Sequence, residues 1–137
     1  MDQSPIDDLE WAAAPADHFT GDAWFGPMSL SEDPDGLDVL GVQFAPGART
    51  DWHRHPGGQV LHVISGSGIV ASVTGERVVM AAGDTVTTLP NDLHWHGAGP
   101  DSPLLHLSIT VGGKTVWAAE SVTDEQYAGR RDTENRP

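Results

Sequence analysis

The sequence predicts an all-β protein that folds as one barrel-shaped domain. Short runs of β-branched and apolar residues recur from residue 19 onward, and each is long enough for a single strand. Glycine and proline, with 16 and 10 copies, gather between these runs, where they indicate turns. Many short strands separated in this way are typical of a β-sandwich or barrel. Helical periodicity is too brief to compete, although residues 120–127 could form a short terminal helix.

The expected strands follow one another along the chain. Residues 19–30 hold one or two short strands, and the Pro, Asp and Gly chemistry of residues 31–36 indicates a turn. Residues 38–44 alternate in polarity, which places Leu40 and Val42 on one face of a strand. The later strands are separated by segments that contain glycine or proline. Their expected ranges are 50–55, 59–64, 68–73, 77–81, 85–89, 93–97, 104–111 and 115–118.

Three segments are expected in the chain. Residues 1–16 are polar and carry few pattern cues, so they form an N-terminal arm that is disordered or packs on a neighbour through Trp11. Residues 17–127 form the barrel domain. Residues 128–137 are polar and charged, which predicts a flexible C-terminal tail. There is no internal repeat, and the length suits a single domain with its own core.

Charge and composition exclude several classes of function. The formal net charge is −13, from 20 acidic and 7 basic residues, which disfavours nucleic acid and anionic membranes as partners. The chain has no cysteine, so disulfides and thiolate chemistry are excluded. No apolar stretch reaches the about 18 residues of a membrane span, and the acidic start lacks the layout of a signal peptide. We therefore expect a cytoplasmic protein that acts on a small molecule.

Four residues in two glycine-bounded segments predict a metal site. His53 and His55 are two residues apart, so on an extended strand both imidazoles point to the same face and can reach one ion. His94 and the amide oxygen of Gln59 come from elsewhere in the chain and would complete the site inside the barrel. These residues could instead be ordinary surface or core histidines, and a lone His-x-His pair would favour that interpretation. The presence of both glycine-bounded segments favours a metal site.

The four candidate ligands are all neutral. Three imidazoles and an amide leave the charge of a divalent ion uncompensated, whereas a glutamate in place of Gln59 would cancel one unit. The site should therefore be a strong Lewis acid that favours an anionic or oxygen-donor ligand in its open positions. Nitrogen and oxygen ligands suit Mn, Fe, Co, Ni, Cu or Zn, and the residues alone do not choose among them.

Two further histidines are candidates for catalytic roles. His96 follows His94 by two residues and shares its strand face, so it is a fifth ligand, a partner of the ligands, a proton relay or a structural histidine. His106 and Thr110 alternate onto one face of a strand, and we expect that face to point inward. Imidazole titrates near neutrality, which makes His106 our preferred general base. Trp95 points to the opposite face, where we expect it to pack against a neighbouring sheet.

At these residues the chain resembles the cupins. The first motif of that family is a glycine, a His-x-His pair, an acidic residue and a distal glycine. It matches residues 47–66, with Gln59 in place of the usual glutamate. The second motif, a glycine, a proline and a histidine, matches residues 83–94 with one residue more than usual before the proline. The resemblance spans about residues 18–127 and implies a jelly-roll barrel, also described as a double-stranded β-helix.

A closer resemblance is to the small single-domain bacterial cupins that include manganese-dependent hydroxynitrile lyases. Segments 46–53, 55–59, 94–98 and 122–127 carry it. It implies a divalent ion, most often manganese, and assembly as a homodimer or a higher oligomer. The implied metal ligands are His53, His55, Gln59 and His94. The implied proton-transfer group is His106, and the implied substrate pocket includes Leu40, Val42 and Thr110.

Three functions remain open from the sequence. The first is reversible cleavage of a cyanohydrin to an aldehyde and cyanide, or a related carbon–carbon addition such as a nitroaldol reaction. The second is a different enzyme class, either a cupin polyketide cyclase or a metal-dependent dioxygenase. The third is a non-catalytic module that binds a metal or a small ligand. A narrow pocket would favour the first, a wide aromatic pocket the cyclase, and a metal site with no open position the binding module.

Overall fold

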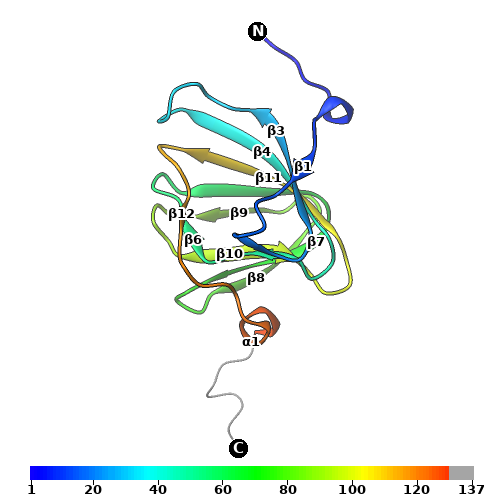
Figure 1. The fold of residues 1–137 in the computed structure, drawn as a ribbon, viewed down its shortest axis with the longest axis vertical. Coiled ribbons are helices and arrows are strands. Elements are labelled where there is room, and N and C mark those ends of the chain that lie inside the picture. Colours follow the sequence, from blue (N-terminus) through cyan, green and yellow to red (C-terminus); the bar gives the residue numbers. More distant parts are fainter. Residues whose placement is uncertain (130–137) are drawn as a thin grey trace, which may run out of the picture.

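Residues 1–129 are described by a computed structural model, in which antiparallel strands curl into one barrel of two sheets (Figure 1). The first sheet has the strand order β1, β3, β4, β11, β7, β9, and the second has the order β8, β7, β10, β5, β2. Strand β6 pairs with β10, and β12 pairs with β6. The all-β barrel that the sequence predicts is confirmed, as is its single domain.

Strand β7 belongs to both sheets and joins them. The elements of the first sheet other than β7 are β1 (Ala12–Ala13), β3 (Ala23–Ser29), β4 (Leu37–Phe44), β9 (Thr85–Thr88) and β11 (Leu104–Val111). Those of the second are β2 (Phe19–Thr20), β5 (Arg49–Thr50), β6 (His53–Arg54), β8 (Arg77–Ala81), β10 (His94–Ala98) and β12 (Val116–Trp117). The shared strand is β7 (Gln59–Ser72), and the helical elements are η1 (Ile6–Asp8) and α1 (Asp124–Ala128).

The expectation of two separate strands at residues 59–64 and 68–73 is wrong, because β7 runs through both ranges. Gly66 lies between them with a φ of 80°, and a β-carbon there would lie 1.9 Å from the carbonyl oxygen of Pro103. Glycine thus allows β11 to approach and the strand to bend without ending. A bulge accompanies the bend, since Leu105 pairs with Ser65 but the next residue of β11 pairs with Val63.

The bulge changes which residues of β7 face the barrel interior. Before it, the buried residues Leu61 and Val63 belong to the main core, together with Phe44, Met80 and Leu104 from other strands. After it, Val70 belongs to this core, whereas Ile69 and Ala71 pack on the outside of the second sheet. Odd-numbered residues therefore face inward in the first half of β7, and even-numbered residues do so in the second half.

The N-terminal segment packs on the outside of the first sheet. Strand β1 pairs with β3, and Trp11 lies over two glycines, Gly26 and Gly41. A β-carbon on either glycine would lie less than 3 Å from the indole ring, so the absence of side chains makes room for Trp11. The arm and tail boundaries remain predictions, and residues 130–137 of the expected tail lie outside the described residues.

Helix α1 covers the outer face of the second sheet (Figure 1). Its five residues are too few for a stable isolated helix, so packing and capping must hold it. Thr123 and Gln126 form a capping box at its start. Trp95, which is 1% exposed, packs beneath it with Val122 and Tyr127 rather than against the neighbouring sheet that we expected. Within the part of the chain described, no helix is both long and apolar enough to cross a membrane.

Candidate metal centre

Two paired strands bring the candidate ligands together. His53 of β6 pairs directly with His94 of β10, so their side chains leave the second sheet side by side. Alternation along β10 turns His94 and His96 into the barrel and Trp95 out of it. All three histidines are at most 3% exposed. The face shared by His94 and His96, which the sequence suggested, is thus present in the structure.

Backbone hydrogen bonds set the tautomers of two histidines. Nδ1–H of His53 donates to the carbonyl oxygen of Asp51 at 2.9 Å, and Nδ1–H of His94 donates to that of Asp92 at 2.8 Å. Each bond leaves a lone pair on Nε2, which is the form in which imidazole binds a metal. His55, two residues after His53, has a buried Nε2 that none of the described residues hydrogen-bonds. These three nitrogens are therefore available as donors.

The residues fit a divalent cation. Donor nitrogens of His53, His94 and His96 lie within 4.8 Å of one another, a group of metal-binding geometry. The ring of His55 lies next to this group, with its centroid 5.1 Å from that of His53. The structure thus brings His53, His55 and His94 to one place, as the sequence predicts, although His96 rather than His55 completes the tightest group of three.

Gln59 provides a second indication of a cation. Its Nε2 donates to the hydroxyl of Ser108 at 2.8 Å, so its Oε1 faces Nε2 of His94 at 2.9 Å. With Nδ1 of His94 protonated, both facing atoms carry lone pairs. Two acceptors this close repel each other unless they share a positive charge. A metal ion bound by both would remove that conflict.

A narrow cavity, which we call the front cavity, lies beside these residues. Side chains of β2, β3 and β12 form part of its lining. Its volume is about 50 Å³, which is well below the range of typical ligand sites and leaves room for a small group only. Aromatic and aliphatic side chains form the outer wall, and polar groups form the inner end. The half-buried lining residues are Phe19, Phe25, Leu40, Thr115 and Trp117, and the buried ones are Val42, Thr50, His53, His55, Gln59, His96 and Ser108.

The predicted pocket residues are only partly brought together. Leu40 and Val42 line this front cavity, whereas Thr110 pairs with Gln59 in the sheet and is not among the lining residues. The aromatic residues Phe19 and Trp117 also line the cavity and were not predicted. Both belong to strands of only two residues, which are too short for a periodic pattern to reveal.

His106 lies behind His96 rather than at the cavity surface. Nε2 of His106 is 3.0 Å from Nδ1 of His96, and His106 is 0% exposed. Nε2 of His96 and Nδ1 of His106 have no hydrogen-bond partner among residues 1–129. Nδ1 of His96 is therefore hydrogen-bonded to His106, whereas Nε2 of His96 is available to the ligand group. This pair can pass a proton away from the cavity.

Burial keeps these imidazoles neutral. Loss of solvation is the main cause that lowers the pKa of His106 to about 4 and that of His55 to about 4. Burial, followed by the charge of His106, holds the pKa of His96 well below its usual range. At neutral pH the imidazoles are therefore unprotonated, which is the form that binds a cation.

The metal-free protein should lose stability in mild acid. The unfolded chain protonates histidine near pH 6.5, whereas folded His106 does so at about 4, so protons favour unfolding between these values. The free energy of unfolding should be constant above pH 6.5 and fall as the pH approaches 4, with about 3 kcal/mol from His106 alone. Urea unfolding across this range measures the slope. The slope should be smaller in His106→Asn, and an equal slope in both proteins would contradict the assignment.

Comparison with known proteins decides the family. The Cupin_2 model, described as a cupin domain, matches residues 41–115, which hold all four candidate ligands and most of the residues that line the front cavity. The chain is a cupin. The resemblance noted in the sequence is therefore confirmed. This cupin carries glutamine at position 59, where the family motif usually has glutamate.

Relatives extend the match to most of the chain. This cupin is 44% identical over 115 residues to the (R)-mandelonitrile lyase of Granulicella tundricola, a match that covers 82% of this chain and 88% of that protein. It superposes on a cupin-like protein from Thermotoga maritima with a TM-score of 0.84 and 36% identity, covering 94% and 98% of the two chains. A polyketide cyclase from Streptomyces resistomycificus gives a TM-score of 0.74 at 14% identity, covering 93% and 90%, which shows a shared fold alone.

Proposed function

We propose that this cupin is a metal-dependent lyase that cleaves a cyanohydrin into an aldehyde and cyanide. The observation that carries the proposal is the front cavity, whose aromatic wall ends on neutral donors and a histidine pair. Similarity over most of the chain to a mandelonitrile lyase supports the same reaction. The reverse reaction and nitroaldol additions would use the same groups.

The metal would be held by His53, His55, Gln59 and His94, and we propose manganese from the resemblance to hydroxynitrile lyases. Such an ion, when bound, supplies a Lewis acid that lowers the pKa of a nearby hydroxyl and stabilises developing negative charge. No carboxylate is among the described residues that line the front cavity. The described lining of the front cavity therefore carries no negative charge that could neutralise the ion, and an anionic product such as cyanide suits this side of the site.

Proton transfer is assigned to His96 and His106. In cleavage, the hydroxyl proton of the cyanohydrin passes to Nε2 of His96, while Nδ1 of His96 hands its proton to Nε2 of His106. The carbon–carbon bond then breaks, its electron pair leaves with the cyanide, and the returning proton gives hydrogen cyanide. His106 acts through His96 because it does not reach the cavity itself.

Cavity shape sets the substrate class. Leu40 and Val42 lie opposite the ligand residues, and the aromatic rings of Phe19, Phe25 and Trp117 surround the entrance. A volume of about 50 Å³ suits a small aryl or alkyl group better than a fused polyketide. The narrow cavity thus favours the lyase over the cyclase. Thr110 remains a proposed residue of the pocket edge.

Removal of the metal should abolish cleavage of mandelonitrile. Protein stripped with a chelator should release benzaldehyde and cyanide at the background rate, and Mn²⁺ should restore the activity. Circular dichroism of the stripped protein controls for unfolding. Mandelonitrile cleavage that persists after complete removal of the metal would contradict the proposal. Failure of Mn²⁺, Fe²⁺, Co²⁺ and Zn²⁺ alike to support cleavage would do the same, and oxygen uptake with phenolic substrates would then identify a dioxygenase.

A further inference from the structure

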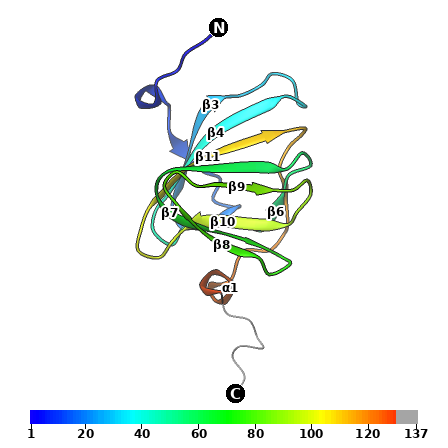
Figure 2. The ribbon, with the colours of Figure 1, turned by 180° about the vertical axis from the view of Figure 1, so that it is seen from behind.

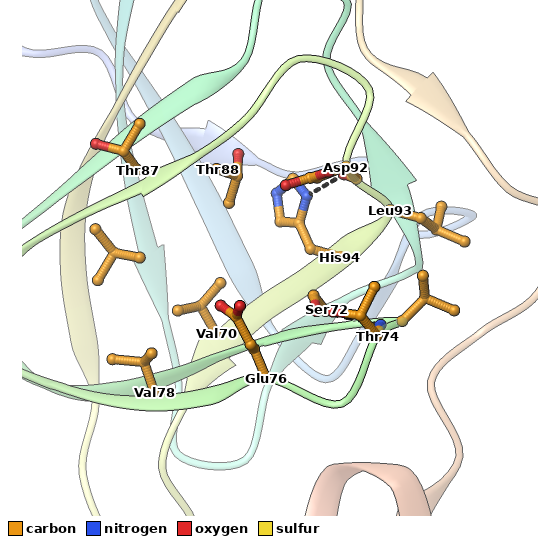
Figure 3. A pocket seen from close by; sticks show the side chains of 12 residues that line it. Val70, Ser72, Thr74, Glu76, Val78, Thr87, Thr88, Asp92, Leu93 and His94 are labelled. Atoms are coloured by element: carbon orange, nitrogen blue, oxygen red, sulfur yellow. Dashed lines mark hydrogen bonds between the residues drawn. The ribbon is translucent and has the colours of Figure 1, made fainter.

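A second cavity reaches the candidate metal centre from the rear of the barrel. It lies between β9 and the β7–β8 hairpin, on the side that Figure 2 presents, and its volume is about 550 Å³ with its open mouth. Figure 3 shows His94 at its inner end, with Thr88 on one side and Ser72 and Glu76 on the other. Val70 and other valines line the rest. The proposed function does not use this rear cavity.

The two cavities differ in chemistry. The rear cavity is lined by the carboxylates of Glu76 and Asp92 and by the hydroxyls of Ser72, Thr74 and Thr88. The front cavity has an aromatic and aliphatic entrance, and the described residues that line it include no carboxylate. Hydrated divalent cations exchange their water most readily for carboxylate and hydroxyl oxygens. The rear cavity therefore suits a cation on its way in, and the front cavity suits an organic substrate.

His94 connects the rear cavity to the ligand group. Of the four candidate ligands it alone lines the rear cavity, whereas His53, His55 and Gln59 line the front cavity. One of its ring nitrogens nevertheless lies within the cluster formed with His53 and His96. Its Nδ1–H donates to the backbone carbonyl oxygen of Asp92, a residue of the rear cavity. A cation in the rear cavity therefore meets His94 first, beside the carboxylate of Asp92.

We propose that the rear cavity is the loading route for the metal ion, with Glu76 as the attracting group at its mouth and His94 as the first ligand. The inference rests on the metal site of the proposed function. In this proposal the metal ion enters through the rear cavity, whereas substrate and product pass through the front cavity. A residue that only lies on the route changes the association and dissociation rates together, so the equilibrium affinity stays the same.

Stopped-flow mixing of the metal-free protein with Co²⁺, followed by the absorption of the bound ion, tests the route. Glu76→Gln should lower the association rate constant about fivefold or more and leave the dissociation constant within about twofold. Glu125→Gln is the matched control, because it removes the same charge from an exposed position on α1. Val78→Trp, which fills the rear cavity, should slow association further. Leu40→Trp, which fills the front cavity, should leave association unchanged.

The outcomes of this experiment distinguish the proposed loading route from the metal centre itself. Equal association rates for wild type, Glu76→Gln and Val78→Trp would overturn the rear route, as would slow association in Leu40→Trp alone. A changed dissociation constant in Glu76→Gln with an unchanged association rate would make Glu76 part of the site and also overturn the route. If wild-type protein binds no Co²⁺ at equilibrium, the metal centre itself is absent and the proposed function falls together with the route.

Discussion

Replacement of His106 by asparagine should leave metal affinity within about twofold and lower kcat for mandelonitrile cleavage by about 10²- to 10⁴-fold. Affinity should persist because His106 lies behind His96, and the candidate ligands keep their own backbone bonds. Turnover should fall because His96 loses the group that takes its second proton. Isothermal titration with Mn²⁺ and steady-state kinetics measure the two effects on the same protein.

Two controls distinguish proton transfer from structural damage. His62→Asn makes the same substitution away from the candidate metal centre, where the His62 ring hydrogen-bonds the hydroxyl of Thr85, and it should leave kcat unchanged. The pH profile is the second control, because loss of the relay should change the acid limb of kcat whereas general loosening of the core would not. Full activity in His106→Asn would remove His106 from the mechanism.

Gly97→Ala should destabilise the protein by about 3 kcal/mol, at the upper end of the cost of overpacking. A β-carbon on Gly97 would lie 2.4 Å from the carbonyl oxygen of Ala48 and 2.6 Å from Cβ of Arg49. Both contacts belong to β5 or the residue before it, so β10 would have to move away from β5. Because His96 precedes Gly97, we also expect the movement to weaken metal binding.

Gly99→Ala is the matched control for this substitution. A β-carbon there would meet only the hydroxyl of Ser67, at 3.7 Å, which is an ordinary contact. Its expected cost is below about 0.5 kcal/mol. Urea unfolding gives both changes in stability, and Co²⁺ titration gives both changes in affinity. Similar stability for the two variants would show that β10 and β5 have room to separate.

The metal site was the most predictable part of the molecule. His53 and His94 lie on the paired strands β6 and β10, and His55 directly follows β6, so the spacing of two residues still brings both histidines to one place. The glycine signals were less reliable at residues 65–68. Gly66 is needed there because two strands approach closely, which depends on a segment distant in the sequence. In the sequence alone, a glycine with this role looks the same as a glycine in a turn.

Tertiary contacts account for the other differences. Alternation correctly turned Trp95 to the outer face, but its partner is a helix of five residues that only packing and capping stabilise. The depth of His106 behind His96 depends on how two sheets face each other, which no local pattern contains. For the same reason, the aromatic entrance at Phe19 and Trp117 became visible only in three dimensions.

The bulge in β7 restricts how the length of this chain can vary. Since opposite parities face inward on its two sides, an insertion or deletion of one residue between Val63 and Val70 would turn one half of the strand over. Either Gln59 would leave the ligand group or Val70 would leave the core. Related sequences should therefore show gaps in exposed turns such as residues 31–36, and very few inside residues 59–72.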